Sequence, residues 1–389
     1  MILPLPPATG RARVAVVATP FGFGPASKAY SIGQVLARHH ALDVTYYGTG
    51  SALDFLTAQP GIRTEPLGSS RPGQDPPALA AADAVVNVLA PELVTTAALA
   101  ARTYYVDSLG FMWGAADLPP DSPLHQVRAY LAQDIFDSAA HLARLGLRAV
   151  IPVSGIVAPP PALPSPAVPP EGAAVRKAER IPVLVHLGGL GNPAGHTSGQ
   201  VYLTLVERLL TALRRDHPDG MSVAMNQANG AFTLGAGLPV RQLSAAGFHH
   251  ALAGCDTVLS SPGLTTLVEV SQARRPYVPL PPQNWSQVLI SRRLAARPGP
   301  PGLWPFLMSP YDRIAEQAPE AEKAMAVSEI NRQLGRDDGY LTRYARLARH
   351  AMANPRTPDV GAPFEGAREV AAVVAADLAT RRGADESAH

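Results

Sequence analysis

A proline-rich segment divides this chain into two series of alternating strands and helices. The segment, Ala158 to Gly172, reads APPPALPSPAVPPEG, and neither a helix nor a sheet accommodates prolines at that density. On each side of it, short apolar runs alternate with amphipathic helical patterns, which is typical of α/β layers built on parallel strands. A chain of 389 residues is long enough for two such domains, so the segment is interpreted as the linker between them.

The apolar runs are short and unbroken, as expected for strands that are buried on both faces of a parallel sheet. The first half predicts strands at Arg13 to Thr19, Leu42 to Tyr47, Ala84 to Leu89, Thr103 to Val106 and Arg148 to Val153, with helices after Pro25, at Pro91 to Ala101 and at His125 to Leu145. The second half predicts strands at Pro182 to Leu187, Met221 to Met225, Val240 to Leu243, Thr257 to Leu259 and Pro276 to Leu280, with helices at Tyr202 to Leu213, Phe248 to Ala253 and finally Ala367 to Ala379.

Composition argues against several classes of protein. The formal charge is +2 with acidic and basic residues interspersed, so no nucleic-acid partner is expected. No run approaches ~20 consecutive apolar residues, which argues against a membrane protein. The N-terminus lacks the pattern of a signal peptide and Cys255 is the single cysteine, so we expect a cytoplasmic protein without disulfides. His249 and His250 are adjacent, but further ligands at suitable spacing are missing, so neither a metal nor a cofactor is predicted.

The stretch from Ser260 to Gln287 carries the most specific functional signal. An apolar run ends in Ser-Ser-Pro-Gly, and a helical pattern follows with Glu269 about two turns in. A glycine turn before a helix places free backbone N–H groups and a positive dipole end where an anion can bind. Glu269 is able to accept hydrogen bonds from vicinal hydroxyl groups, and the side-chain amides of the loop after the next strand are suited to a sugar ring. A surface glutamate on an ordinary amphipathic helix would give the same pattern. The residues concerned are Ser261, Gly263, Leu264, Thr265, Glu269, Gln283, Asn284 and Gln287.

This stretch resembles the donor-binding half of GT-B glycosyltransferases. The resemblance is firm over about residues 181 to 295 and extends more loosely over nearly the whole chain. It implies an α/β protein of two Rossmann-like domains that face each other across a cleft, with a last helix that crosses back to the first domain. The expected boundaries are 1–157 for the acceptor domain, 158–180 for the linker, 181–364 for the UDP-sugar domain, and 365–389 for the returning helix and tail. A metal-independent mechanism is implied, in agreement with the absence of an Asp-X-Asp motif.

Two further groups of residues enter the donor site by this resemblance. Gly188, Gly189 and Gly191 follow a strand, and their lack of a Cβ lets backbone N–H groups converge on a phosphate, with Asn192 as an additional donor. Arg241, Gln242 and Leu243 occupy the strand end at which GT-B enzymes usually hold the uracil base.

The first half carries a glycine turn of its own, Phe21-Gly22-Phe23-Gly24. It is not a dinucleotide fingerprint, because Ser27 stands at the third glycine position and no acidic residue follows the second strand. In GT-B enzymes this turn usually carries a Gly-His pair whose histidine is the general base. No histidine lies between Ala8 and Arg38, so the base is left open, and a catalytically silent partner that only binds a nucleotide sugar is one alternative.

The absence of the Gly-His pair points to a resemblance with a narrower group of enzymes. The segments PFGFGPASKA, YYVDSLGFMW and PPQNWSQ are similar to the cytosylglucuronate synthases of nucleoside-antibiotic pathways, which transfer glucuronate from UDP-glucuronate to N1 of cytosine. A planar acceptor suits the aromatic residues of the first half, because bases stack on aromatic faces. These residues are Phe21, Phe23, Tyr104, Phe111 and Trp113, of which some, Tyr104 foremost, are equally expected in the core.

Two charged residues are the candidates for catalysis. Asp107 directly follows a strand, so it is the first candidate for the base that takes the N1 proton; an N-cap or orienting role is the alternative. Lys28 lies one turn inside the first helix and would face a uronate carboxylate or the leaving diphosphate, unless it is a solvated surface lysine. Arg274 and Arg275 are weaker candidates for the same charge.

We therefore expect an inverting GT-B glycosyltransferase that binds a UDP-sugar, most specifically UDP-glucuronate, and a small planar acceptor such as cytosine. The alternatives are a transferase for another natural-product or lipid-linked acceptor and a non-hydrolysing sugar-nucleotide epimerase, which has the same fold. A monomer and a homodimer are both compatible with the sequence.

Overall fold

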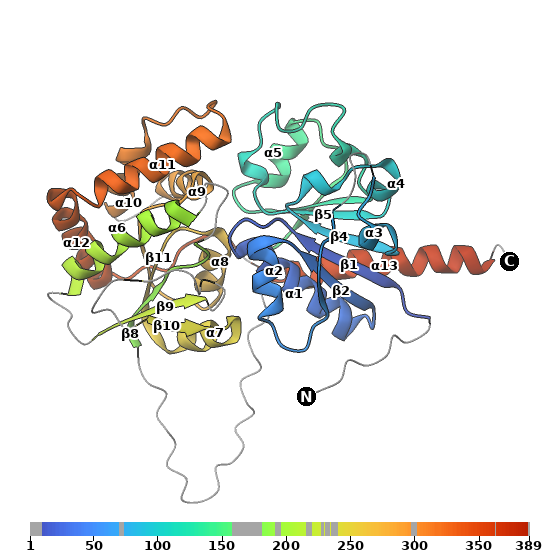
Figure 1. The fold of residues 1–389 in the computed structure, drawn as a ribbon, viewed down its shortest axis with the longest axis horizontal. Coiled ribbons are helices and arrows are strands. Elements are labelled where there is room, and N and C mark those ends of the chain that lie inside the picture. The colour runs from blue at the N-terminus through green and yellow to red at the C-terminus, as the bar shows by residue number, and fades with distance from the viewer. Residues whose placement is uncertain are drawn as a thin grey trace, which may run out of the picture. The chain divides into compact units, whose positions relative to one another are not determined.

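A computed structural model describes residues 10–69, 74–157, 181–190, 196–214, 220–226, 229, 234, 240–296, 302–361 and 363–387. The chain divides into two compact units (Figure 1). The first combines Met1–Ala158 with Gly361–His389, and the second comprises Pro159–Val360. The proline-rich linker expected at 158–180 lies outside the described residues, as do Gly191 and Asn192 of the expected donor site.

The first unit is built on a parallel sheet of seven strands in the part of the chain that is described. Its order is β3-β2-β1-β4-β5-β6-β7, which extends the Rossmann order by one strand. The chain runs outward from β1 to β3 and then returns to the other side of β1, so the direction switches between β1 and β4. The strands are β1 (Arg13–Ala18), β2 (Asp43–Gly48), β3 (Thr64–Pro66), β4 (Ala84–Val88), β5 (Thr103–Asp107), β6 (Ala129–Gln133) and β7 (Val150–Val153).

The helices of the first unit follow the alternation, with two corrections. The long helix expected from His125 to Leu145 is wrong, because β6 occupies its centre and pairs with both β5 and β7. An apolar run of this length fits a buried strand as well as a helix, and only the pairing decides. The helix expected from Pro91 to Ala101 is likewise two short pieces. The helical elements are α1 (Gly24–His39), α2 (Gly50–Thr57), α3 (Pro77–Ala80), η1 (Pro91–Leu93), α4 (Ala97–Ala100), η2 (Gly110–Met112), η3 (Pro123–Gln126) and α5 (Ser138–Arg144).

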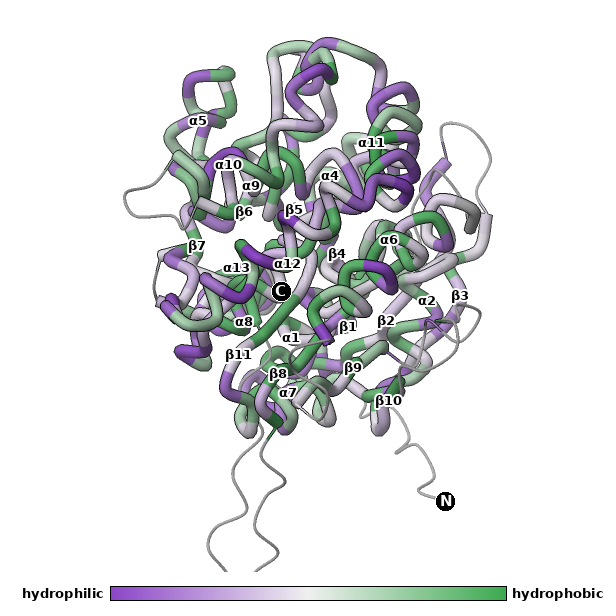
Figure 2. The backbone as a smooth tube through the Cα atoms, turned by 90° about the vertical axis from the view of Figure 1, so that its left-hand side faces the viewer, coloured by the Kyte–Doolittle hydropathy of each residue, from purple (hydrophilic) through white to green (hydrophobic). Residues whose placement is uncertain are grey.

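The second unit has a parallel sheet of five strands among the described residues, in the order β10-β9-β8-β11-β12. Here the direction switches between β8 and β11. Because parallel crossovers are right-handed, the helix before the switch and those after it cover opposite faces of the sheet. Much of β1 and β11 is hydrophobic, as expected for central strands (Figure 2). The strands are β8 (Ile181–His186), β9 (Met221–Asn226), β10 (Val240–Leu243), β11 (Cys255–Ser260) and β12 (Tyr277–Pro279).

The long helices of the second unit gather against one another as well as against the sheet. Helices α11 and α12 pack on α6, and α10 packs on α9. The helical elements are α6 (His196–Arg214), α7 (Ala245–Gly254), α8 (Leu264–Gln272), α9 (Trp285–Ala295), α10 (Leu303–Met308), η5 (Ser309–Tyr311), α11 (Glu320–Leu334) and α12 (Asp338–Ala353). Within the described residues, no helix combines the length and the apolar character that a bilayer span requires.

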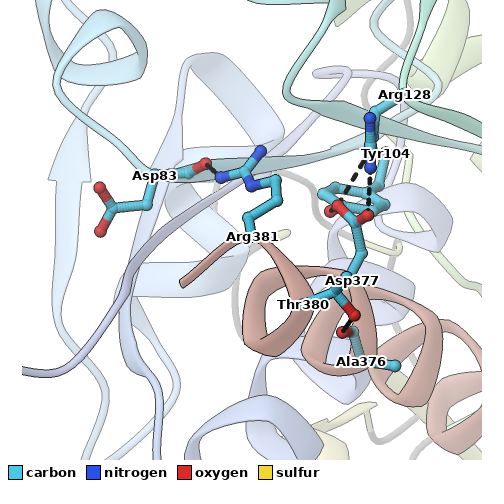
Figure 3. Close-up of polar contacts among 7 residues, drawn as sticks. All are labelled: Asp83, Tyr104, Arg128, Ala376, Asp377, Thr380 and Arg381. Atoms are coloured by element: carbon cyan, nitrogen blue, oxygen red, sulfur yellow. Dashed lines mark hydrogen bonds and ion pairs between the residues drawn. The ribbon is translucent and has the colours of Figure 1, made fainter. Parts of the chain in front are cut away.

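The last helix, α13 (Gly366–Ser387), belongs to the first unit and packs against α1. Figure 3 shows how it is held: the hydroxyl of Tyr104 and the guanidinium of Arg128 both donate to the carboxylate of Asp377. Arg381 donates to the carbonyl oxygen of Asp83 over 2.7 Å. Two consecutive Rossmann-like units, with a final helix that returns to the first, make the GT-B plan, and the expected fold class is confirmed.

Candidate functional site

The carboxyl ends of β8 and β11 mark the switch point of the second unit. Ligands of open parallel sheets bind where the strand order reverses, outside the carboxyl ends of the strands. His186 and Ser260 are register partners at the ends of these two strands. The chain leaves β8 into Leu187, Gly188 and Gly189, and it leaves β11 into Ser261, Pro262 and Gly263. The two glycine segments predicted from the sequence therefore emerge next to each other.

The turn after β8 depends on a left-handed glycine. Gly188 has φ of +60°, a conformation that favours glycine. Asn229 holds this turn, because its Nδ2 donates to the Gly188 carbonyl over 2.6 Å and its Oδ1 accepts from the Leu190 N–H over 3.1 Å. A Cβ placed on Gly188 would lie 4.0 Å from Nε2 of Gln283. Gly189 follows and is half-buried. Asn229 was not predicted, and nothing in its local sequence distinguishes it.

The amino end of α8 offers backbone donors. Gly263 is the N-cap residue and makes no side-chain capping hydrogen bond, so it leaves the first-turn N–H groups without the usual cap. The first turn contains no acidic residue. Leu264 is buried at its start, and the side chain of Thr265 is half-buried. A helix end of this composition attracts an anion.

The predicted amide residues meet at the same place. Gln283 Nε2 donates to the Ser261 hydroxyl oxygen over 2.9 Å, and the Gln283 backbone N–H donates to Gln287 Oε1, also over 2.9 Å. A Cβ on Gly263 would lie 3.6 Å from Nε2 of Gln287. Gln283 and Gln287 therefore flank the two glycine segments. The side chain of Asn284 has a different task, because it caps α9 by accepting from the Gln287 N–H over 3.1 Å.

Glu269 lies on α8 and has a histidine partner. It is 8% exposed, and its Oε1 is 3.2 Å from Nε2 of His249 on α7. Burial lowers the pKa of His249, but the hydrogen bond and the charge of Glu269 outweigh burial and raise it overall. His249 is half-buried, whereas its neighbour His250 is exposed. The contact with Glu269 was not predicted.

His186 completes this cluster from β8. Its ring stacks on Phe248 with 4.0 Å between ring centroids. Burial lowers its pKa to about 4, so the imidazole is neutral at physiological pH. Among the described residues, its Nδ1 has no hydrogen-bond partner. Its place directly at the carboxyl end of an inner strand is a signal in the sequence for a residue near a ligand site.

The residues expected to hold the uracil base lie away from the switch point of the sheet. Arg241, Gln242 and Leu243 belong to β10, which pairs with β9 rather than with β8. Arg241 and Gln242 are exposed and Leu243 is half-buried. The structure therefore does not bring them to the β8–β11 switch point.

The switch point of the first unit carries the turn Phe21 to Gly24. Gly22 has φ of +61°, and its carbonyl accepts from the Ser51 hydroxyl over 3.1 Å. Phe23 is buried and packs on Phe55 with 5.8 Å between ring centroids, whereas Phe21 is half-buried. Gly24 is the first residue of α1. Phe23 is thus a core residue, and Phe21 is the aromatic residue of this turn that keeps some exposure.

Asp107 is enclosed by internal donors. It is completely buried at the end of β5. Its Oδ1 accepts from the Leu109 N–H over 2.7 Å, and its Oδ2 accepts from Trp113 Nε1 and from the Tyr130 hydroxyl, each over 2.5 Å. Burial raises the pKa of this carboxyl group, and the three hydrogen bonds oppose the rise. A base must reach its substrate, so this geometry favours the orienting role that was the alternative for Asp107.

The other aromatic residues predicted for the acceptor site also divide into buried and partly accessible side chains. Tyr104 is 1% exposed, and its hydroxyl binds Asp377 on α13, which places it in the core rather than in an acceptor site. Phe111 is also buried and packs edge-on against Phe136 at 5.1 Å between centroids. Trp113 is half-buried and is held by Asp107. Phe21 and Trp113 are therefore the members of the predicted aromatic set that remain partly accessible.

Lys28 is buried, at 2% exposure, in the second turn of α1. The alternative of a solvated surface lysine is therefore wrong. Burial of an ammonium group is costly unless it is compensated, and Lys28 is among the residues that have an interaction partner.

Comparison with known proteins yields matches by structure only. No protein-family model and no curated protein sequence matches this chain. The glycosyltransferase SnogD from Streptomyces nogalater has a similar structure, with 17% identity over 94% of this chain and 99% of that chain and a TM-score of 0.43. Spinosyn forosaminyltransferase SpnP has 16% identity over 94% and 99%, with a TM-score of 0.42. UDP-GlcNAc 2-epimerase from Neisseria meningitidis, bound to UDP-GlcNAc, has 11% identity over 93% and 99%, with a TM-score of 0.47.

Proposed function

We propose that the second unit binds a UDP-sugar at its β8–β11 switch point. The observation that carries this proposal is the convergence there of the Gly188 turn, the uncapped amino end of α8 and the amide side chains of Gln283 and Gln287. Backbone N–H groups and a helix dipole stabilise a diphosphate without a metal ion. The site thus has donors for a diphosphate beside donors and acceptors for a sugar.

Glu269 fits the ribose in this arrangement. It lies six residues after Gly263, which corresponds to ~9 Å along a helix axis at 1.5 Å per residue. Its buried carboxylate is an acceptor for vicinal hydroxyl groups. The nucleoside would therefore extend along α8, away from the diphosphate, while the sugar would lie towards Gln283 and Gln287.

The proposed reaction is transfer of the sugar with inversion. The bond between the anomeric carbon and the diphosphate oxygen breaks as the acceptor nitrogen or oxygen bonds to that carbon from the opposite side. The charge that develops on the leaving UDP is stabilised by the N–H groups of α8, and the acceptor proton passes to a base. Asp107 is assigned to holding Trp113 in place, so the base itself is left unassigned.

The specific pair that we propose is UDP-glucuronate as the donor and N1 of cytosine as the acceptor. The support is the resemblance of PFGFGPASKA, YYVDSLGFMW and PPQNWSQ to cytosylglucuronate synthases. The partial exposure of Phe21 and Trp113 supports a planar acceptor, because bases stack on aromatic rings.

A product assay tests the proposal. The protein is incubated with UDP-glucuronate or UDP-GlcNAc and with cytosine or other planar acceptors, and the products are identified by mass spectrometry. We expect cytosylglucuronate and UDP, with the product reduced at least about tenfold in Glu269→Gln. Transfer from UDP-GlcNAc alone would refute the donor assignment, and interconversion of UDP-GlcNAc epimers without an acceptor would refute transferase activity.

A further inference from the structure

Three elements of the second unit bring titratable side chains to one point. His249 comes from α7, Glu269 from α8 and His186 from β8. His249 Nε2 contacts Glu269 Oε1 at 3.2 Å, and both side chains are largely buried, with 13% and 9% of their surface exposed. The proposed nucleotide site accounts for Glu269, but it gives no reason for a buried histidine against this carboxylate.

We propose that His249 is a positioning residue for recognition of the nucleotide's ribose, through its contact with Glu269. The inference rests on the proposed function, in which Glu269 accepts hydrogen bonds from the ribose. The imidazole holds Oε1 in place, and Oε2 has no hydrogen-bond partner among the described residues. A carboxylate on a helix otherwise samples several rotamers, so fixing one oxygen presents the other in one direction.

The neighbouring groups do not replace His249 in this role. Among the described residues, the titratable side chains that interact with Glu269 are His249 and His186. His186 is neutral at physiological pH and stacks on Phe248, which keeps its ring in place against α7. Loss of His249 would therefore leave Glu269 without a partner that orients it.

The test measures discrimination between two ligands that differ only in the ribose hydroxyl groups. Calorimetry gives the dissociation constants of UDP and of 2′,3′-dideoxy-UDP for the wild-type protein and for variants. We expect the wild type to prefer UDP by about tenfold or more and His249→Ala to lose most of that preference, as Glu269→Gln does. Affinity for the dideoxy compound should stay unchanged, which separates a loss of ribose recognition from general damage.

Two matched variants distinguish positioning from packing. The amide nitrogen of glutamine approximates the position of Nε2, whereas that of asparagine approximates Nδ1. We expect His249→Gln to retain the preference for UDP and His249→Asn to lose it, although both are polar and smaller than histidine. His250→Ala, at the exposed neighbour on the same helix, should behave as wild type.

The outcomes separate the two proposals. If the wild-type protein binds both ligands equally, Glu269 does not recognise the ribose, and the inference fails together with that part of the proposed function. If the wild type discriminates and His249→Ala and His249→Asn discriminate equally well, the inference is overturned while the proposed function stands. An NMR titration tests the contact itself: Glu269→Gln should lower the pKa of His249, and an unchanged value would contradict the pairing.

Discussion

The switch points of the two sheets have the same topology, and both begin a helix without a side-chain cap, but they carry different side chains. In each, the first strand of the unit lies beside the strand to which the chain returns, so each has the geometry in which parallel sheets bind ligands. At β8–β11, polar side chains and uncapped backbone groups converge around two glycine segments. At β1–β4, the turn carries Phe21 and Phe23. The contrast shows that topology selects the place, whereas the residues after the strands select the ligand.

Two polar side chains at the carboxyl ends of strands in the first unit, Asn87 and Asp107, form hydrogen bonds with other groups of the same unit. Asn87 at the end of β4 both donates to and accepts from Ala90, over 2.8 and 3.0 Å. Asp107, on the next strand, accepts three hydrogen bonds. These interactions rigidify the edge. They are consistent with the flat, weakly polar acceptor that we propose.

The largest expected effect comes from placing a negative charge at Gly263. An aspartate there would cap α8 and repel a diphosphate, so we expect Gly263→Asp to weaken UDP binding about 100-fold without loss of folding stability. Its φ of −71° accepts any residue, and a Cβ would make only an ordinary contact. Gly263→Ala is the matched neutral control and should bind UDP nearly as well as wild type. If calorimetry shows that the aspartate variant binds UDP as tightly as the wild type, the diphosphate does not bind at this helix end.

Asp107 allows the roles of base and structural acceptor to be separated. Asparagine has one acceptor oxygen, so in Asp107→Asn an NH₂ group would face either the Leu109 N–H or the two donors now at Oδ2. We expect the free energy of unfolding to fall by about 2 kcal/mol. Turnover per folded molecule should change less than about tenfold, because loss of a general base typically costs 10²-fold or more. Urea unfolding and steady-state kinetics measure the two quantities, and a larger loss of turnover at unchanged stability would restore Asp107 as the base.

His186 and His249 should make the stability of the second unit depend on pH in opposite directions. The pKa of His186 is lowered to about 4 in the folded protein, against about 6.5 in the unfolded chain. Below about pH 6.5 the unfolded state therefore binds more protons, and the stability falls as the pH is lowered. This amounts to about 2 kcal/mol between about pH 7 and about pH 5. The raised pKa of His249 contributes stability that is present below its unfolded pKa and is lost as pH rises through its folded pKa.

Urea unfolding of His186→Phe, followed by the fluorescence of Trp285 and Trp304 in the second unit, checks this dependence. Phenylalanine keeps the stack on Phe248 and removes the titration, so the variant should lose less stability on acidification than the wild type. An identical acid response in both proteins would mean that His186 is not the group that titrates. His249→Gln should lose more stability on acidification than the wild type, because it removes a stabilising contribution that is present at low pH.

The sequence predicted the two units, most strands and the position of glycine residues after β8 and β11, because these follow from local patterns. Apolar runs identify strands, and a glycine turn followed by a helix identifies an anion site without knowledge of the neighbours. The prediction failed where long-range contacts decide. The run around Tyr130 is a strand because β5 and β7 flank it. The hydrogen bonds that Asp107 accepts from Trp113 and Tyr130, and the contact of His249 with Glu269, likewise arise only from packing between separate elements.

The smallest expected effect concerns Tyr104, for which the two interpretations predict different measurements. If its hydroxyl serves to hold α13, Tyr104→Phe should lower the free energy of unfolding by about 1 kcal/mol, the usual cost of one hydrogen bond. Amide hydrogen exchange should then accelerate in α13 and leave α8 unchanged, because Asp377 keeps Arg128 but loses the buried donor. The KM for the acceptor should remain that of the wild type, since the ring faces α13 rather than a ligand. A higher KM for the acceptor with unaltered hydrogen exchange in α13 would indicate that Tyr104 belongs to the acceptor site. It would also weaken the contrast between the two switch points.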